Sequence, residues 1–155
     1  MIKLADAGAT LHAGGVLARL VRGGDAIALI GDLGAGKTTF VSGAVAALGG
    51  GGATSPTFAL INEYRGGRLT VWHLDLYRIG GAHELAELGL EEVIGEPSGI
   101  ALVEWADRFA VMPSDHLRVV LAHVEGGNQR RLTATGTGPR GAELASALVT
   151  ELLGC

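Results

Sequence analysis

The chain has 155 residues, which fits one domain of typical size, and its 48% hydrophobic and 18% charged residues exclude disorder over most of its length. Twelve basic against sixteen acidic side chains give a net charge of −4, so the chain lacks the excess of basic residues that direct binding to nucleic acid requires. The only cysteine, Cys155, is the last residue, which excludes an internal disulfide framework and favours a reducing compartment.

The chain shows neither a secretory signal nor a membrane span. Residues 1–20 lack a compact apolar core, because Asp6, His12 and several glycines interrupt them. The longest uncharged stretch, residues 38–62, is broken by a glycine run and by Pro56 far short of a spanning helix. We therefore expect a cytoplasmic protein with no membrane segment.

The first half of the chain opens like an α/β fold. Apolar spacing and glycine boundaries predict a helix at 10–21, a strand buried on both faces at 26–30 and a helix at 38–48. Two further candidate strands, 58–64 and 69–76, flank a glycine-containing turn and predict a hairpin. At least one antiparallel strand pair is therefore expected.

The second half continues the alternation of helices and strands. We predict a short helix at 82–88, strands at 100–103, 117–123 and 130–134, and a closing helix at 143–153. The total is about six strands with three or four helices. Residues 1–155 are thus expected to form a single three-layer α/β domain with a mixed, mostly parallel sheet and an antiparallel portion.

The loop between the first predicted strand and the second predicted helix matches the pattern G-x-x-x-x-G-K-[ST] at every required position. In this pattern successive backbone N–H groups converge on phosphates, and the helix N-terminus adds partial positive charge. Lys37 then reaches the β- and γ-phosphates, and the Thr38 hydroxyl is positioned to coordinate magnesium. A glycine-biased chain produces such strings by chance, but the strand before and the helix after favour a true P-loop. The expected domain is therefore of the P-loop NTPase type.

A P-loop protein also needs an acidic residue at the end of a neighbouring buried strand to complete the metal site. Glu104 ends the strand predicted at 100–103, and Trp105 and Asp107 follow it. Glu104 is either a metal residue, directly or through water, or an ordinary charge at a strand end; the P-loop favours the metal role. Trp105 fits core packing and the edge of a site equally well.

Two further segments carry polar groups that fit two interpretations each. In H-L-D-L-Y-R, strand alternation places His73, Asp75 and Tyr77 on one face, and spacing alone favours a solvated face. The string T-S-P-T at 54–57 is either a plain proline turn or a switch-like loop with hydroxyls near a γ-phosphate. The other histidines lack ligand spacing and receive no role.

Four strings occur in order along the chain: G-D-L-G-A-G-K-T-T, S-P-T-F, H-L-D-L-Y-R and V-E-W. Together they closely resemble the TsaE family, formerly YjeE, from the helix at Thr10 to the strand near Arg131. The resemblance implies a small cytoplasmic P-loop ATPase needed to make threonylcarbamoyladenosine beside the anticodon of tRNAs that read codons beginning with adenosine. It also implies slow hydrolysis of ATP alone, and action on a TsaB–TsaD complex, in which TsaD transfers the threonylcarbamoyl group and the ATPase supports repeated turnover.

The resemblance further implies roles for individual residues. The family's metal-site glutamate falls on Glu104, which with Thr38 is expected to hold Mg²⁺. Asp75 matches an aspartate whose loss impairs family members, which reverses the interpretation from spacing and makes Asp75 and Glu104 the catalytic candidates. Residues 55–57 match the family's switch-like loop. The residues implied to bind ATP are Gly31, Asp32, Leu33, Gly34, Ala35, Gly36, Lys37, Thr38, Thr39 and Trp105.

The ends of the nucleotide site are less closely defined. The family's glycine-and-arginine turn near the base falls on residues 127–131, so either Arg130 or Arg131 approaches the nucleotide. The adenine-side contact near the N-terminus falls around Ala7 to Leu11. Because the chain is acidic, we expect it to meet tRNA only through its partners.

Two other function classes are weighed against the ATPase. A small-molecule P-loop kinase carries an arginine-rich lid, and the sequence between Glu84 and Pro97 contains no arginine. A GTP-dependent switch carries an Asn-Lys-x-Asp guanine reader, which is absent from the sequence. The preference for ATP follows from that absence and from the resemblance.

Overall fold

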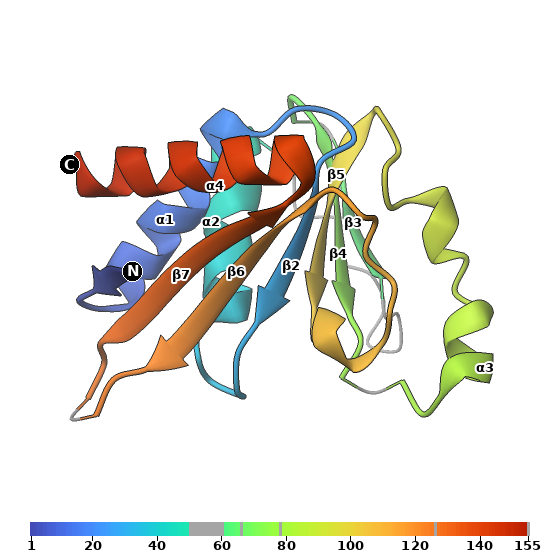
Figure 1. The fold of residues 1–155 in the computed structure, drawn as a ribbon, viewed down its shortest axis with the longest axis horizontal. Helices are drawn as coiled ribbons and strands as arrows, with labels where there is room; N and C mark the ends of the chain where they lie inside the picture. The colour runs from blue at the N-terminus through green and yellow to red at the C-terminus, as the bar shows by residue number, and fades with distance from the viewer. Residues whose placement is uncertain (50–60, 66, 78, 126, 155) are drawn as a thin grey trace.

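The computed structural model describes residues 1–49, 61–65, 67–77, 79–125 and 127–154. These residues form a seven-stranded sheet with helices packed on it (Figure 1). The strands are β1 (Ile2–Leu4), β2 (Ala26–Ile30), β3 (Ile61–Tyr64), β4 (Thr70–Asp75), β5 (Gly99–Glu104), β6 (His116–His123) and β7 (Arg130–Thr137). The helices are α1 (Ala7–Leu20), α2 (Lys37–Leu48), α3 (Ala82–Ala86) and α4 (Gly138–Leu153), with 3-10 turns η1 (Leu90–Glu92) and η2 (Ala106–Arg108).

The sheet has the strand order β1-β7-β6-β2-β5-β4-β3. The four central strands β6, β2, β5 and β4 are parallel, whereas β3, β7 and β1 pair antiparallel to their neighbours. The predicted α/β class with a mixed sheet is therefore confirmed. The carboxyl ends of β2, β4 and β5 meet at one edge, where ligands bind in open parallel sheets.

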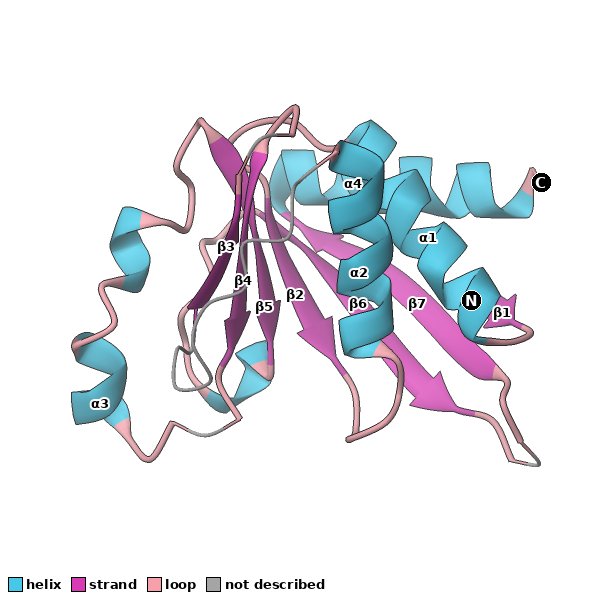
Figure 2. Ribbon diagram, turned by 180° about the vertical axis from the view of Figure 1, so that it is seen from behind, coloured by secondary structure: helices cyan, strands magenta, loops and turns pink. Residues whose placement is uncertain are grey.

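The two faces of the sheet are covered differently. Helices α1, α2 and α4 pack on one face around Phe40, Leu17 and Leu29, and Figure 2 shows α1 and α2 in front of the strands. On the other face, Trp72, Leu74 and Val103 pack against the chain from Ile79 to Met112, which contains α3, η1 and η2. The third layer therefore consists of short helical turns and loops.

Several element boundaries differ from those predicted. Strand β1 was not predicted, because three residues are too few to show a period. Residues 58–60 of the predicted hairpin strand lie outside the described residues, and β3 begins at Ile61. Helix α4 begins at Gly138 and not at Glu143, because its first turn is capped by Asp115, whose carboxylate accepts the N–H groups of Arg140 and Gly141. No helix in the described part of the chain is long and apolar enough to cross a membrane.

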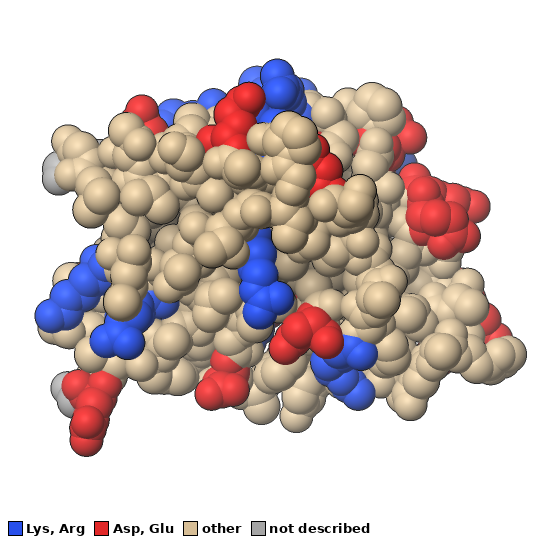
Figure 3. All heavy atoms as spheres, viewed as in Figure 1, with Lys and Arg blue, Asp and Glu red and all other residues tan. Residues whose placement is uncertain are grey.

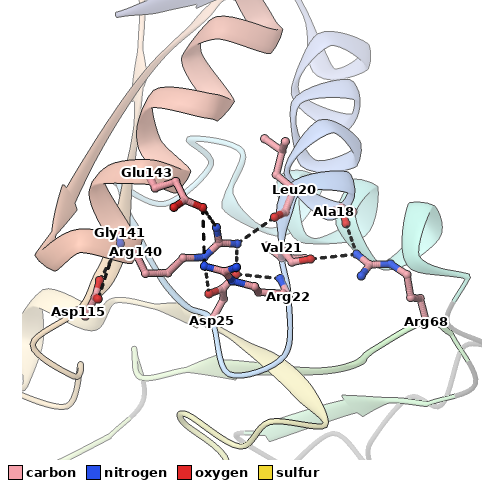
Figure 4. Close-up of polar contacts among 10 residues, drawn as sticks. All are labelled: Ala18, Leu20, Val21, Arg22, Asp25, Arg68, Asp115, Arg140, Gly141 and Glu143. Carbon is pink, nitrogen blue, oxygen red and sulfur yellow. Dashed lines mark hydrogen bonds and ion pairs between the residues drawn. The ribbon is translucent and has the colours of Figure 1, made fainter.

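A polar cluster joins α4 and α1 to the loop before β2 (Figure 4). Arg140 on α4 donates to both carboxylate oxygens of Asp25 at 3.0 and 2.8 Å and to Leu20 O at 3.0 Å. These charged hydrogen bonds raise the pKa of Arg140 above its ordinary value, mainly through Asp25. Arg68 caps the end of α1 by donating to Ala18 O and Val21 O. The cluster fixes the start of β2, which leads into the P-loop.

Helices α1 and α2 are in backbone contact through two glycines. A Cβ on Gly14 would lie 2.0 Å from Phe40 O, and a Cβ on Gly43 would lie 2.0 Å from Leu11 O. No side chain larger than hydrogen fits at either position without moving a helix. Since α2 carries the P-loop at its N-terminus, this contact helps to position the phosphate-binding loop.

We expect Gly14→Ala to lower the free energy of unfolding by about 3 kcal/mol, because the new methyl group meets backbone that cannot rotate away. The matched control is Gly15→Ala, whose Cβ would lie 3.7 Å from the Ala47 Cβ, an ordinary contact. The control should be neutral or stabilised by up to about 1 kcal/mol through helix propensity. Urea unfolding measures both variants, and equal stabilities would contradict the close helix contact.

Candidate functional site

The P-loop has the backbone conformation that its sequence requires. Gly34 and Gly36 have φ angles of 79° and 105°, a region that side chains other than glycine rarely adopt. A Cβ on Gly31 would lie 2.4 Å from Leu121 O, so the loop also passes close to β6. Gly36 is the N-cap of α2, and no side chain accepts a hydrogen bond there. The N–H groups of the first turn are thus left for an anion.

Lys37 lies in the centre of the site. Its Nζ donates to Gly31 O, and to Asp32 O at 3.0 Å, and lies 4.3 Å from the centre of the Trp105 ring. Burial lowers the pKa of Lys37 below its ordinary value of 10.5, and this effect is opposed by carboxylates, Glu104 and Asp75 first. The site therefore holds a desolvated cation whose compensation comes from acidic groups at the strand ends.

Glu104 meets the P-loop helix at the end of β5. The residue is only 4% exposed, and its Oε2 lies 3.5 Å from Thr38 Oγ1. The same oxygen forms a short contact with His73 Nε2 from β4. A hydroxyl and a carboxylate therefore face each other at the start of α2, as the sequence predicted for these two residues.

Asp75 ends β4 directly beside Glu104. The two residues are register partners in the parallel pair β4–β5, so their side chains lie on the same face of the sheet. Asp75 Oδ1 accepts the N–H of Tyr77 at 3.0 Å, which fixes the turn after the strand. The face is the one that α2 covers, and the solvated-face interpretation from spacing alone is therefore wrong for Asp75.

Trp105 adopts an unusual backbone conformation. It is the one residue other than glycine with positive φ in the described part of the chain, at 60°. This left-handed turn places its ring 5.0 Å from the Tyr77 ring and over Lys37. Trp105 also packs against the hydrophobic cluster on the second face of the sheet, so both interpretations that its sequence left open, core packing and the edge of the site, apply to it.

Two adjoining hollows surround the P-loop. A first hollow of about 420 Å³ is lined by Asp6, Ala7, Gly8, Thr10, Gly34, Gly36, Thr39, Asn128 and Arg130. A second hollow of about 230 Å³ is lined by Leu33, Gly34, Gly36, Lys37, Thr38, Thr39, Asp75, Tyr77, Glu104 and Trp105. Because Gly34, Gly36 and Thr39 line both, one extended ligand could span the two.

The first hollow distinguishes the two candidate arginines. Arg130 lines it and donates to Gly34 O at 3.1 Å, whereas Arg131 is not among its lining residues and pairs with Lys3 of β1. Ala7 and Thr10 also line this hollow, and both belong to the N-terminal segment expected to face the base. Asn128 belongs to the turn at 127–131 that the resemblance places near the base, whereas Asp6 was not predicted for the site, because an isolated acidic residue before a helix is an ordinary N-cap.

Most of the residues predicted for the site come together. Asp32 and Ala35 shape the loop, since the Ala35 N–H donates to Asp32 O at 3.0 Å, while Leu33 is 64% exposed at its tip. Residues 54–57, the candidate switch-like loop, lie outside the described residues. The sequence missed His73 as a site residue, although its alternation with Asp75 placed both on one face.

The oxygens of this site fit a magnesium ion. Mg²⁺ is usually held by one or two protein oxygens together with substrate phosphates and water. Thr38 Oγ1 and the Glu104 carboxylate supply such oxygens beside the P-loop, and Asp75 lies next to them. The donor set is therefore the one that a nucleotide-bound Mg²⁺ would use.

Comparison with known proteins places the chain in a family. The family described as "Threonylcarbamoyl adenosine biosynthesis protein TsaE" matches residues 4–132. The chain belongs to the TsaE family. A TsaE protein of Nostoc sp. is 43% identical over 141 residues, covering 85% of this chain and 84% of the relative. The TsaE protein of Bacillus subtilis is 40% identical, covering 79% of this chain and 77% of the relative.

A solved structure of the same architecture agrees with the TsaE assignment. The crystal structure of Bacillus subtilis YdiB superposes with a TM-score of 0.80 at 33% identity, covering 97% of this chain and 93% of that chain. The chain is therefore a member of a family that acts in the biosynthesis of threonylcarbamoyladenosine in tRNA. The resemblance found in its four sequence strings is confirmed.

Proposed function

We propose that this TsaE family member binds ATP with Mg²⁺ and hydrolyses it, and that hydrolysis supports repeated turnover of a TsaB–TsaD threonylcarbamoyl transferase. The observation that carries the proposal is the meeting of Lys37, Thr38, Asp75 and Glu104 in one hollow at the P-loop. Family membership supplies the tRNA modification in which the activity would be used.

The two hollows divide the nucleotide between them. The first hollow would receive the base and ribose, with Arg130 and Thr10 on its walls, and the second would receive the phosphates. Lys37 would exchange its carbonyl partners in the loop for the β- and γ-phosphate oxygens, which supply more negative charge than Gly31 O and Asp32 O. Trp105 limits the space in which the lysine can move.

The carboxylates of Asp75 and Glu104, together with Thr38, would carry out the hydrolysis. Thr38 and Glu104 would hold Mg²⁺, directly or through water, and the ion would neutralise charge on the phosphates. Asp75, beside Glu104 and open to the second hollow, would orient the attacking water. Two adjacent carboxylates repel each other, and a cation between them relieves that repulsion.

The surface charge favours contact with tRNA through partner proteins. On the face drawn in Figure 3, basic and acidic side chains are interspersed, and the described residues there form no continuous basic stripe. The net charge of −4 points the same way, since nonspecific binding to nucleic acid comes mainly from contacts between cations and phosphates. TsaB and TsaD are thus proposed to hold the tRNA.

A reconstituted modification reaction tests the proposal. The number of threonylcarbamoyladenosine residues formed per TsaD should exceed one when this protein, ATP and Mg²⁺ are present with TsaB, TsaD, tRNA and an activated threonylcarbamoyl donor in excess. When the protein or ATP is omitted, modification should stop after about one round. Equal yields with and without the protein would contradict the proposed role.

Asp75→Asn should reduce ATP turnover in the presence of the partners by about 100-fold while leaving nucleotide affinity within about twofold. The amide keeps the volume and accepts the Tyr77 N–H, but it cannot take up a proton from water as a carboxylate does. Glu92→Gln is the control for the removal of a carboxylate charge, because Glu92 is exposed in η1 and does not line the second hollow. Equal rates in parent and Asp75→Asn would return Asp75 to a structural role.

A further inference from the structure

His73 on β4 and Glu104 on β5 form a buried pair. His73 is 7% exposed and Glu104 is 4% exposed, and His73 Nε2 contacts Glu104 Oε2. An ionised carboxylate only accepts hydrogen bonds, so the imidazole Nε2 carries the hydrogen and donates it. A carboxylate this deeply buried needs such a donor, because an unpaired buried charge is strongly unfavourable.

The histidine reaches Glu104 from the side away from the P-loop. Glu104 lines the second hollow, whereas His73 lines a separate cavity of about 310 Å³ beneath α2 that also contains Val41, Asn62 and Tyr64. Thr38 lines both spaces. His73 therefore does not face the nucleotide side of the site, and any effect on the reaction passes through Glu104.

The contacts of Glu104 orient its carboxylate. His73 Nε2 and Thr38 Oγ1 both contact Oε2, on which they converge from β4 and from α2. The other oxygen, Oε1, is used by neither of these neighbours. Holding one oxygen of a carboxylate fixes its rotation about the last side-chain bond, and so fixes where the other oxygen points.

We propose that His73 is a positioning residue, which holds the Glu104 carboxylate so that the remaining oxygen is presented to Mg²⁺ or to a water of its shell. The inference rests on the proposed function, because it assigns a purpose to His73 only if Glu104 serves a metal. Removal of a residue that forms a hydrogen bond to a metal ligand typically lowers metal affinity or activity by about 10–100-fold.

Three variants of His73 test this role. His73→Leu removes the donor, His73→Gln places an amide N–H at nearly the reach of the imidazole Nε2, and His73→Asn keeps an amide that is too short to reach. Calorimetry gives the affinity for a non-hydrolysable ATP analogue as a function of Mg²⁺ concentration. Thermal unfolding of each variant shows that it is folded.

Mg²⁺ is expected to raise the affinity for the ATP analogue. We expect His73→Leu and His73→Asn to need about tenfold more Mg²⁺ than the parent to reach half of that increase. His73→Gln should need no more than about twofold extra, and the affinity measured without Mg²⁺ should be the same in all four proteins. Loss of packing alone would lower the metal-free affinity as well. Equal Mg²⁺ requirements in the parent, His73→Leu and His73→Asn would overturn the inference.

A double variant tests whether His73 affects the Mg²⁺ requirement only through Glu104. In a Glu104→Gln background, His73→Leu should change the Mg²⁺ requirement by less than about twofold. The amide has no charged oxygen to present to Mg²⁺, so His73 has no carboxylate left to position and the two effects are not additive. Additive losses would overturn the inference. A parent protein whose nucleotide affinity ignores Mg²⁺ would overturn the proposed function and this inference together, whereas a Mg²⁺ response that His73→Leu leaves unchanged would overturn this inference alone.

Discussion

Lys37→Ala is expected to lower ATP hydrolysis by at least about 100-fold, both in the isolated protein and with its partners. The variant keeps the N–H groups of the P-loop but loses the cation that faces the most negative phosphates. The fold should survive, because the Lys37 ammonium contacts only loop carbonyls and the face of the Trp105 ring, and its charge is disfavoured by burial. Hydrolysis and nucleotide affinity are both measured.

Lys3→Ala is the matched control for this experiment. Lys3 is the only other lysine in the sequence, and it lies exposed on β1, away from both hollows. Its removal should leave the rate within about twofold of the parent. If Lys37→Ala hydrolyses ATP as fast as Lys3→Ala, the P-loop is not the site of hydrolysis.

Glu104→Gln is expected to weaken Mg²⁺-dependent hydrolysis by about 100-fold with little change in stability. The amide has the same size, and its oxygen can accept the hydrogen bond from His73, so the buried contact between β4 and β5 is kept. The negative charge offered to the cation is lost. Rates measured over a range of Mg²⁺ concentrations should show a higher requirement and a lower maximum.

Glu92→Gln provides the control for charge removal. Glu92 is an exposed residue of η1 that lies outside the second hollow. Its substitution should leave the Mg²⁺ dependence unchanged. An unchanged dependence in Glu104→Gln as well would make Glu104 an ordinary charge at a strand end.

The local parts of the site could be predicted because short-range patterns determine them. The P-loop, the strand before it and the helix after it follow from glycine spacing and a buried apolar run, and β2 has the predicted bounds of 26–30. Glu104 followed from the same reasoning, since it ends a strand of the kind that pairs beside a P-loop strand.

The non-local parts could not be predicted from spacing. Asp75 reaches the site only because β4 pairs with β5 in a register that joins it to Glu104, and no local pattern encodes that register. Only the family resemblance identified it. The left-handed turn at Trp105 and the burial of His73 likewise depend on neighbouring strands and not on their own sequence context.

The glycine content hid a third feature. With 26 glycines in the chain, an isolated glycine in a predicted helix carries little information. Gly14 and Gly43 nevertheless lie where α1 and α2 touch through their backbones, a need that appears only when both helices are in place. A glycine that the helix contact requires therefore cannot be distinguished in the sequence from one that reflects the composition bias.

The most direct test of the proposed activity is the rate of ATP hydrolysis by the purified protein at saturating Mg²⁺, measured alone and then with TsaB, TsaD and tRNA. We expect slow hydrolysis alone, a faster rate with the partners, and loss of both rates in Lys37→Ala. No hydrolysis under either condition, or equal rates in the parent and Lys37→Ala, would contradict an ATPase centre at the P-loop.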